Sequence, residues 1–252
     1  MSHHTIDITD VVYTYPDGTD ALRKLTLHIG HGESVAIVGS NGSGKTTLLS
    51  HLSGVLFPTS GTVNIGGYPI IKQTLPQIRR TVGMVFQHPD DQLFMPTVYD
   101  DVAFGPINMG LPTETVNKRV IAALTTVGAL ELKDRPPYRL SGGQKRAVAI
   151  ATVLAMEPDI LVMDEPTAAL DPFARRQLIH LLHTFTHTKI IATHDLDMAL
   201  DLCTRTIILH NGTVLADGAT VEIFRNKPLL EQARLEQPLS LQKCPICSLK
   251  PE

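Results

Sequence analysis

The sequence predicts an α/β fold: a core with a largely parallel sheet, an antiparallel β subdomain, and an inserted helical subdomain. Short continuous apolar runs, several followed by helical spacing, are typical of buried parallel strands. Two runs near the N-terminus instead alternate apolar and polar residues, which is typical of antiparallel strands with one solvated face. Between about 89 and 158 no comparable strand run occurs and the spacing is helical.

The individual elements follow from these patterns. Antiparallel strands are expected at 5–15 and 25–29, because Pro16-Asp17-Gly18 between them favours a turn. Parallel strands are expected at the continuous apolar runs, which are 35–38, 82–86, 160–163, 189–193 and 206–209. Asn211-Gly212 predicts a two-residue hairpin between 206–210 and 213–217. Helical spacing at 113–127 and 141–156 marks the inserted subdomain.

Composition limits the class of protein. The chain has 252 residues, 43% of them hydrophobic and 19% charged, which is enough apolar material for one dominant globular domain. The net charge of −3 does not indicate a nucleic-acid partner. The longest apolar run, 147–156, is far shorter than the ~20 residues of a membrane-spanning helix. No signal peptide is expected at the N-terminus, and three cysteines are too few for a disulfide scaffold.

A glycine-rich loop follows the expected strand 35–38 and precedes a helix. It fits the phosphate-loop pattern, and its residues are Gly39, Ser40, Asn41, Gly42, Ser43, Gly44, Lys45 and Thr46, with Thr47 next. Glycines let successive backbone N–H groups turn toward phosphate oxygens, Lys45 reaches the outer phosphates, and the Thr46 hydroxyl can bind Mg²⁺. A chance glycine turn is the alternative, and the strand and helix on either side argue against it. We therefore predict nucleotide binding on a P-loop NTPase core.

The second element is a pair of carboxylates, Asp164 and Glu165, directly after the apolar run 160–163. Beside a phosphate loop, Asp164 is suited to hold Mg²⁺ and Glu165 to accept a proton from the attacking water. Alone, an acidic strand end is common and is usually just solvated. Together with the phosphate loop it indicates nucleotide hydrolysis.

Between these elements lies Leu140-Ser141-Gly142-Gly143-Gln144, directly before a helix. By itself this is a well-capped helix start. Between a phosphate loop and an acidic strand end, it resembles the signature motif of the ATP-binding-cassette (ABC) ATPases. The resemblance covers the chain from about 5 to 224. It implies an ABC nucleotide-binding domain at 1–237, with the helical subdomain at about 89–158 and a short tail at 238–252.

The resemblance assigns further roles. Tyr15 matches the aromatic residue that stacks on adenine, Gln87 the glutamine that senses Mg²⁺ and the attacking water, and His194 the histidine at the γ-phosphate. An ordinary strand tyrosine and a structural histidine are the alternatives. The segment Ala168-Ala-Leu-Asp171 matches the one that crosses to a second subunit, with Ala168 where many members have serine.

The family also implies how the cassette works. Two cassettes face head to tail, so that Ser141, Gly142, Gly143 and Gln144 of one close over ATP held by Lys45 of the other. The chain has one set of motifs, so a second cassette is required, and a homodimer is expected. ATP would close the dimer and hydrolysis would open it, with ATP and Mg²⁺ as the cofactors.

Several stretches, among them Phe86-Gln-His-Pro-Asp-Asp-Gln-Leu-Phe94, are similar to the energising ATPases of energy-coupling-factor importers, most of all the cobalt and nickel branch. The resemblance implies a multi-span membrane scaffold and a small substrate-capture protein as partners, at the cytoplasmic membrane face. Leu93, Phe94 and Met95 beside Asp90 and Asp91 are expected to belong to the core of the helical subdomain and also to form the scaffold's socket. A vitamin importer of the same type, and a soluble ABC ATPase acting on ribosomes or DNA, are the alternatives.

Two features suggest metal binding. His180, His183 and His187 have the spacing of one helical face, and Cys244-Pro-Ile-Cys247 has the spacing of half a zinc site. Solvated histidines and an incomplete thiol pair are the interpretations we favour.

Overall fold

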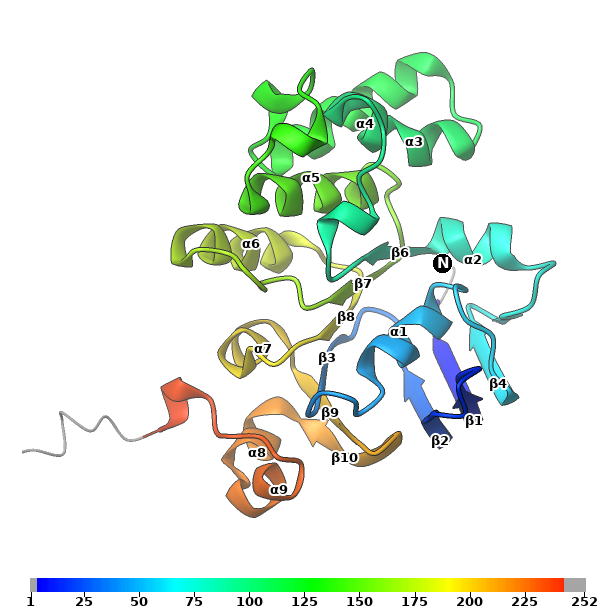
Figure 1. The fold of residues 1–252 in the computed structure, drawn as a ribbon, viewed down its shortest axis with the longest axis vertical. Helices are drawn as coiled ribbons and strands as arrows, with labels where there is room; N and C mark the ends of the chain where they lie inside the picture. Colours follow the sequence, from blue (N-terminus) through cyan, green and yellow to red (C-terminus); the bar gives the residue numbers. More distant parts are fainter. Residues whose placement is uncertain (1–3, 243–252) are drawn as a thin grey trace, which may run out of the picture.

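The computed structural model describes residues 4–242 and contains a six-stranded sheet, in the order β10-β9-β3-β8-β7-β6 (Figure 1). The five strands β9, β3, β8, β7 and β6 run parallel, and β10, at one edge, pairs antiparallel with β9. The strands are β3 (Ser34–Val38), β6 (Val82–Val85), β7 (Ile160–Asp164), β8 (Thr188–Ala192), β9 (Arg205–His210) and β10 (Thr213–Ala219). The prediction of a largely parallel sheet is confirmed.

Both faces of this sheet are covered. Alternate strand residues such as Val35 and Ile37 pack toward helix α1 and a second sheet, whereas Ala36 and Val38 pack toward the opposite helices. The second sheet has the order β2-β1-β4-β5, with β1 (Ile6–Thr14), β2 (Asp20–Ile29), β4 (Ser60–Ile65) and β5 (Tyr68–Pro69). The helices on the two sides are α1 (Lys45–Leu52) and α2 (Leu75–Thr81), and α6 (Pro172–Thr184), α7 (Leu196–Leu202), α8 (Thr220–Arg225) and α9 (Lys227–Gln232).

The antiparallel pairing of β1 with β2 is confirmed, and β2 begins at Asp20, earlier than the pattern indicated. Strands β4 and β5 were not predicted from the sequence. The pattern of β4 is weak because its first three residues, Ser60, Gly61 and Thr62, are exposed and not apolar.

The helical subdomain lies above the parallel sheet in Figure 1 and has a hydrophobic core of its own. Its helices are α3 (Val98–Asn108), α4 (Thr113–Thr126) and α5 (Gly142–Leu154). Helix α3 was not expected, because Gly105-Pro106 is a helix-breaking signal. It forms nonetheless, since Thr97 caps it by accepting a hydrogen bond from the Asp100 amide, and Val98 and Val102 are buried.

The predicted hairpin at Asn211-Gly212 is confirmed, and its tip touches the phosphate loop. Asn211 and Gly212 both have positive φ, as such a turn requires. The Gly212 amide donates to the Ser43 carbonyl at 3.1 Å, and a Cβ on Gly212 would lie 2.6 Å from the Ala21 carbonyl oxygen. The hairpin therefore fixes the phosphate loop against β2.

No helix within residues 4–242 is long and apolar enough to span a membrane. At the C-terminal end of this range the carboxylate of Asp197 accepts hydrogen bonds from the amides of Leu239 and Ser240. The predicted tail begins here, and most of it lies outside the described residues.

Candidate active site

The loop between β3 and α1 closes around the ammonium group of Lys45. Lys45 Nζ donates hydrogen bonds to the carbonyl oxygens of Gly39, at 2.8 Å, and Ser40, at 3.2 Å. The side chain is buried, and burial lowers the pKa of Lys45 although Glu165 and Asp164 oppose that shift. Two main-chain carbonyls thus hold the charge of Lys45 inside the loop.

Two glycines are needed for the loop to take this path. Gly39 has φ 156°, and a Cβ there would lie 2.3 Å from the Leu209 carbonyl oxygen. Gly44, the residue before α1, has φ 105°, and a Cβ would lie 2.8 Å from the Ala21 carbonyl oxygen. The loop is therefore fixed by the strands around it.

Asp164 ends β7 beside the first turn of α1. Its side chain is hydrogen-bonded to Thr46, while its Oδ1 is buried with no protein partner. Burial raises the pKa of Asp164, and Lys45 and Arg146 oppose that shift. An orphaned carboxylate oxygen next to a threonine hydroxyl offers two of the hard oxygen ligands that Mg²⁺ takes. The donor set therefore fits this cation.

Glu165 and His194 meet at the carboxyl ends of β7 and β8. The Glu165 amide donates to the Ala192 carbonyl at 2.8 Å, in a left-handed conformation with φ 46°. Glu165 Oε2 accepts hydrogen bonds from the Thr193 hydroxyl and the His194 amide, and lies 2.8 Å from His194 Nδ1. The Glu165 side chain is 10% exposed and that of His194 is 71% exposed. The carboxylate is thus fixed in place, whereas the imidazole faces solvent.

The Gln87 segment is bound to helix α5. The guanidinium of Arg146 donates to the carbonyl oxygens of Phe86 and Gln87. The Gln92 amide side chain accepts from the Phe86 amide and donates to the Ala149 carbonyl. Arg146 is buried, and burial lowers its pKa while Asp164 and Glu165 oppose that shift. The segment therefore belongs to the same rigid unit as α5.

The signature residues form the exposed start of α5. The Ser141 hydroxyl accepts from the Gln144 amide, and the Gln144 side chain accepts from the Ser141 amide, which is a capping box. Ser141, Gly143 and Gln144 line a cavity of about 740 Å³ together with Leu170 and Asp171. Within residues 4–242, these residues are not brought together with the phosphate loop.

Tyr15 and the 168–171 segment are also placed. The Tyr15 hydroxyl lies 2.9 Å from Thr47 Oγ1 in the first turn of α1. Asp171 caps α6 by accepting from the amides of Phe173 and Ala174.

Sequence reasoning missed three residues of this region: Arg146, Gln92 and Arg175. Arg175 on α6 makes a two-pronged ion pair with Asp195, at 2.6 and 2.8 Å, and so connects the residue after His194 to the helix that Asp171 begins. The one local signal is an arginine, Arg146, at the edge of a long apolar run. Each of the three residues has a partner 20 or more positions away, so spacing alone does not reveal these contacts.

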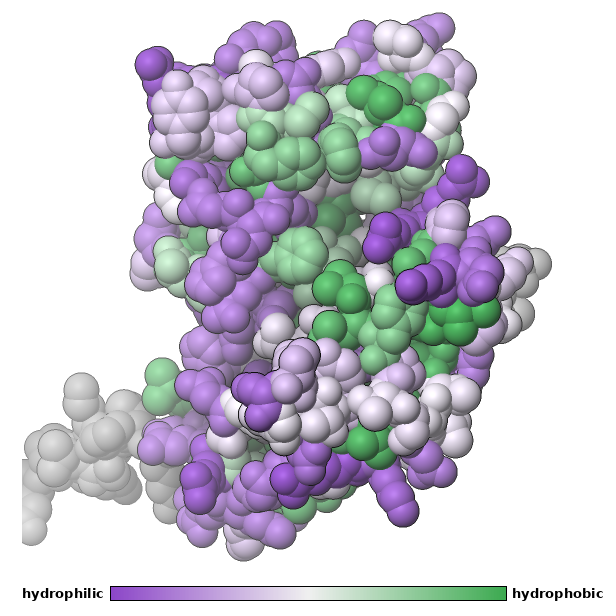
Figure 2. Space-filling view, turned by 45° about the vertical axis from the view of Figure 1, so that its right-hand side comes forward, coloured by the Kyte–Doolittle hydropathy of each residue, from purple (hydrophilic) through white to green (hydrophobic). Residues whose placement is uncertain are grey.

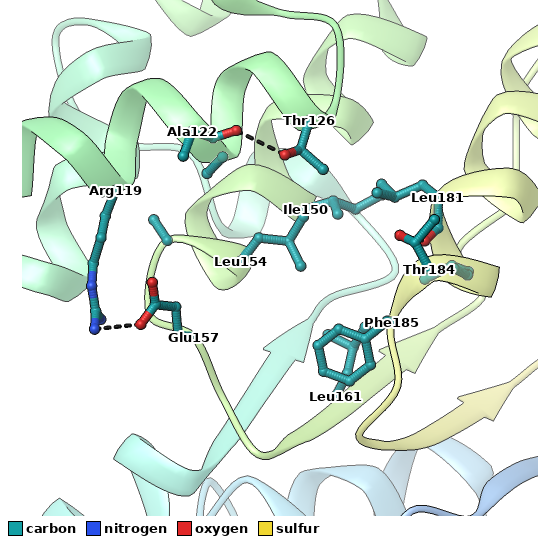
Figure 3. A pocket seen from close by; sticks show the side chains of 13 residues that line it. Arg119, Ala122, Thr126, Ile150, Leu154, Glu157, Leu161, Leu181, Thr184 and Phe185 are labelled. Carbon is teal, nitrogen blue, oxygen red and sulfur yellow. Dashed lines mark hydrogen bonds and ion pairs between the residues drawn. The ribbon is translucent and has the colours of Figure 1, made fainter.

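A smaller cavity of about 230 Å³ lies among α4, α5 and α6, away from the phosphate loop (Figure 3). Leu154, Leu161 and Phe185 line it, and the ion pair of Arg119 with Glu157 lies at its edge. Most of its lining is apolar.

The prediction that three histidines share one helical face is wrong for His187. Helix α6 ends at Thr184, so His180 and His183 lie on it whereas His187 lies in the following loop, where its ring contacts Phe185. Among residues 4–242, no group of three or more histidine, cysteine, aspartate or glutamate side chains is placed to hold a metal ion. The Cys244 and Cys247 pair lies outside the described residues.

A phosphate loop and an acidic strand end on one parallel sheet define a P-loop nucleoside triphosphatase. The sequence profile of the ABC transporter family matches residues 22–168. An ABC transporter ATP-binding protein of Geobacter sulfurreducens is 63% identical, over 98% of this chain and 99% of its own. The energy-coupling factor transporter ATP-binding protein EcfA1 of Methanospirillum hungatei is 47% identical, over 94% of this chain and 87% of its own.

Solved structures agree. CbiO1 from Clostridium perfringens, part of the ABC transporter complex cbiONQ, superimposes with a TM-score of 0.78 at 41% identity, covering 90% of this chain and 93% of its own. The cassette MJ0796, dimeric and bound to ADP and phosphate after hydrolysis, superimposes with a TM-score of 0.79 at 31% identity, covering 85% and 98%. The chain belongs to the ABC transporter ATP-binding family: it binds ATP and is the ATPase subunit of a transporter.

Proposed function

We propose that this chain, with residues 1–237 as its cassette, powers an energy-coupling-factor importer for a transition-metal ion, cobalt or nickel. The observation that carries the importer assignment is an exposed apolar surface on the helical subdomain, formed by Phe94, Phe104 and Ile107. Arg146 of α5 in the same subdomain donates hydrogen bonds to the carbonyls of Phe86 and Gln87, which follow strand β6 of the parallel sheet. The likeness to EcfA1 and to CbiO1 supports the type of importer.

The nucleotide would bind along the phosphate loop. Backbone N–H groups from Gly39 to Thr46 and the Lys45 ammonium would hold the phosphates, and Tyr15 would stack on adenine. Thr46, Gln87 and Asp164 would hold Mg²⁺, which when bound neutralises charge on the outer phosphates.

Hydrolysis would follow from the pair at the ends of β7 and β8. Glu165 would accept the proton of the attacking water, since its carboxylate is held rigidly by Thr193 and the His194 amide. His194 is exposed on the same side and would contact the γ-phosphate. Gln87, held at its carbonyl by Arg146, would orient the water.

A second copy of this chain would complete each site. Ser141, Gly142, Gly143 and Gln144 lie at an exposed helix N-terminus, where N–H groups and the helix dipole favour a γ-phosphate. Because they are separate from their own phosphate loop, they would serve ATP bound to the partner, as the dimeric MJ0796 structure suggests. ATP binding would then close the dimer and hydrolysis would release it.

Membrane partners would dock on the helical subdomain. Phe94 is 63% exposed, Ile107 59% and Phe104 43%, and the rings of Phe94 and Phe104 meet edge to face at 5.0 Å. Hydrophobic side chains gather on the upper part of the molecule, over the helical subdomain, in Figure 2. Leu93, which we expected in this socket, is instead buried in the helical core. A scaffold helix with apolar and basic residues would suit this surface, because Asp91 is exposed near it in the chain, whereas Asp90 already pairs with Lys145.

The test is to purify the chain with its partners from membranes in mild detergent and to measure bound metal. A multi-span scaffold with a small capture protein and stoichiometric cobalt or nickel is the expected result. A vitamin in place of metal would indicate the alternative importer of the same type. Recovery of soluble partners alone would overturn the transport assignment and would leave the ATPase assignment intact.

A point variant tests the docking surface by metal uptake into intact cells that produce the whole transporter. Phe94→Asp is expected to abolish metal uptake while ATP binding stays at the wild-type level. Val221→Asp on α8 is the matched control, since Val221 is 43% exposed and lies outside the helical subdomain. Equal uptake by both variants would contradict the docking site.

A further inference from the structure

A closed circuit of contacts among four residues, Tyr15, Thr47, His51 and Tyr13, connects Tyr15 to helix α1. The Tyr15 hydroxyl lies 2.9 Å from Thr47 Oγ1, and the Thr47 carbonyl oxygen lies 2.7 Å from Nδ1 of His51. The His51 ring meets the Tyr13 ring edge to face at 4.9 Å, with an interplanar angle of 81°. Tyr13 in turn meets Tyr15 edge to face at 5.0 Å and 85°. Both centroid separations lie in the favoured range for aromatic pairs.

His51 is suited to anchor this circuit. It is 0% exposed, and burial lowers its pKa, although hydrogen bonding with the backbone of Thr47 and Phe57 opposes that shift. Because a carbonyl only accepts, Nδ1 must carry the proton that binds the Thr47 carbonyl. Because this hydrogen bond fixes one ring nitrogen, the His51 ring has a defined orientation toward Tyr13.

Tyr13 joins the anchor to the free end of the circuit. Its ring is partly buried and packs on the core between the two sheets, whereas Tyr15 lies beyond the end of β1, in the turn before β2. A side chain in a turn has little to hold it except its own contacts. The two contacts of Tyr15 described here, with Tyr13 and Thr47, both lead back to α1.

We propose that Tyr13 and His51 are positioning residues for the base of ATP: they hold the Tyr15 ring at α1 and thereby set base affinity separately from phosphate affinity. This inference rests on the proposed stacking of adenine on Tyr15. The same helix begins with Lys45 and Thr46, so the circuit places the base contact at a fixed offset from the phosphate contact. Neither Tyr13 nor His51 needs to touch the nucleotide for this effect.

The test compares ATP with tripolyphosphate, which has the phosphates and no base, by titration calorimetry on the full chain. Tyr13→Leu and His51→Leu are each expected to weaken ATP binding about two- to tenfold, the range of one aromatic pair, and to leave tripolyphosphate binding unchanged. Tyr13→Phe keeps the ring and is the matched control, expected to bind ATP as the wild type does.

Each other outcome is decisive. Equal weakening of ATP and tripolyphosphate would mean that the pair only supports α1, and unchanged ATP binding in Tyr13→Leu would also overturn the inference. Tyr15→Leu separates the two levels: if it weakens ATP while the Tyr13 and His51 variants do not, the positioning role fails and the adenine role stands. If Tyr15→Leu leaves ATP binding unchanged, the adenine role itself fails. Should His51→Leu not fold, the Tyr13 pair of variants gives the answer alone, because Tyr13 is only partly buried.

Discussion

The phosphate loop and the signature loop both lead into a helix N-terminus, yet they are built in opposite ways. The phosphate loop is enclosed by β2, the hairpin tip and its own lysine, and glycine is required at Gly39 and Gly44. The signature loop is exposed, and a Cβ on Gly142 would meet nothing within 4 Å. The first is therefore an enclosed loop fixed by its own chain, whereas the second is an open surface that would need a partner to cover it.

The largest expected effect is at Glu165, on the same sheet as the phosphate loop. Glu165→Gln should lower kcat by about 10²- to 10⁴-fold, the usual value of a general base, while ATP binding is retained. The variant should also accumulate as a dimer in ATP, which size-exclusion chromatography measures. Glu157→Gln is the control, since Glu157 pairs with Arg119 on the surface and is 63% exposed. Near-normal turnover in Glu165→Gln would contradict its assignment.

Mixing two inactive variants tests whether the signature half acts across the dimer. Lys45→Ala removes phosphate binding, and Gly143→Asp places a negative charge where the partner's γ-phosphate would lie. Each alone should be inactive. In an equal mixture of freely exchanging homodimers, about a quarter of all sites combine the intact halves of the two chains, so activity should return. A mixture as inactive as its components would mean that the two loops of one and the same chain act on one nucleotide.

The two loops should respond differently to one added methyl group. Gly39→Ala should lower the free energy of unfolding by about 1–3 kcal/mol, because Cβ collides with the Leu209 carbonyl at a positive φ. Gly143→Ala should leave the free energy of unfolding unchanged or raise it by up to about 1 kcal/mol, since alanine favours a helix and the nearest atom is 3.9 Å away. Urea denaturation of both variants measures the difference. Equal losses would show that the signature loop is as constrained as the phosphate loop.

The smallest effect is expected at the helix cap. Ser141→Ala removes the acceptor for the Gln144 amide and should lower the free energy of unfolding by about 1 kcal/mol. An unchanged free energy of unfolding in Ser141→Ala would mean that the cap adds nothing to α5.

What the sequence predicted well was local in the chain. The phosphate loop, the strand end at Asp164 and Glu165, and the hairpin at Asn211-Gly212 each occupy a few consecutive residues whose backbone demands are visible in their types. Helix α3 was missed because burial of Val98 and Val102 outweighs the breaking tendency of Gly105-Pro106. The helical face of His187 failed for the converse reason, since spacing does not show where α6 ends.

Contacts between distant residues could not be predicted in this way. Arg146 is 59 positions from Gln87, and Arg175 is 20 from Asp195, so only the folded chain brings them together. The same holds for Tyr13 and His51, which belong to a strand and a helix. These residues do not form a motif, although they hold in place the residues that do.

The capping box at Ser141 and Gln144 has a consequence for selectivity among anions. Two amides at the start of α5 are already occupied by the chain's own side chains, at 3.0 and 3.3 Å. An anion that binds either of these two amides would have to compete with an internal ligand that is always present at high local concentration. Free phosphate, which arrives without other contacts, competes poorly, whereas a triphosphate already anchored on another chain arrives with most of its ordering complete. The cap in this way acts as a threshold against adventitious anions.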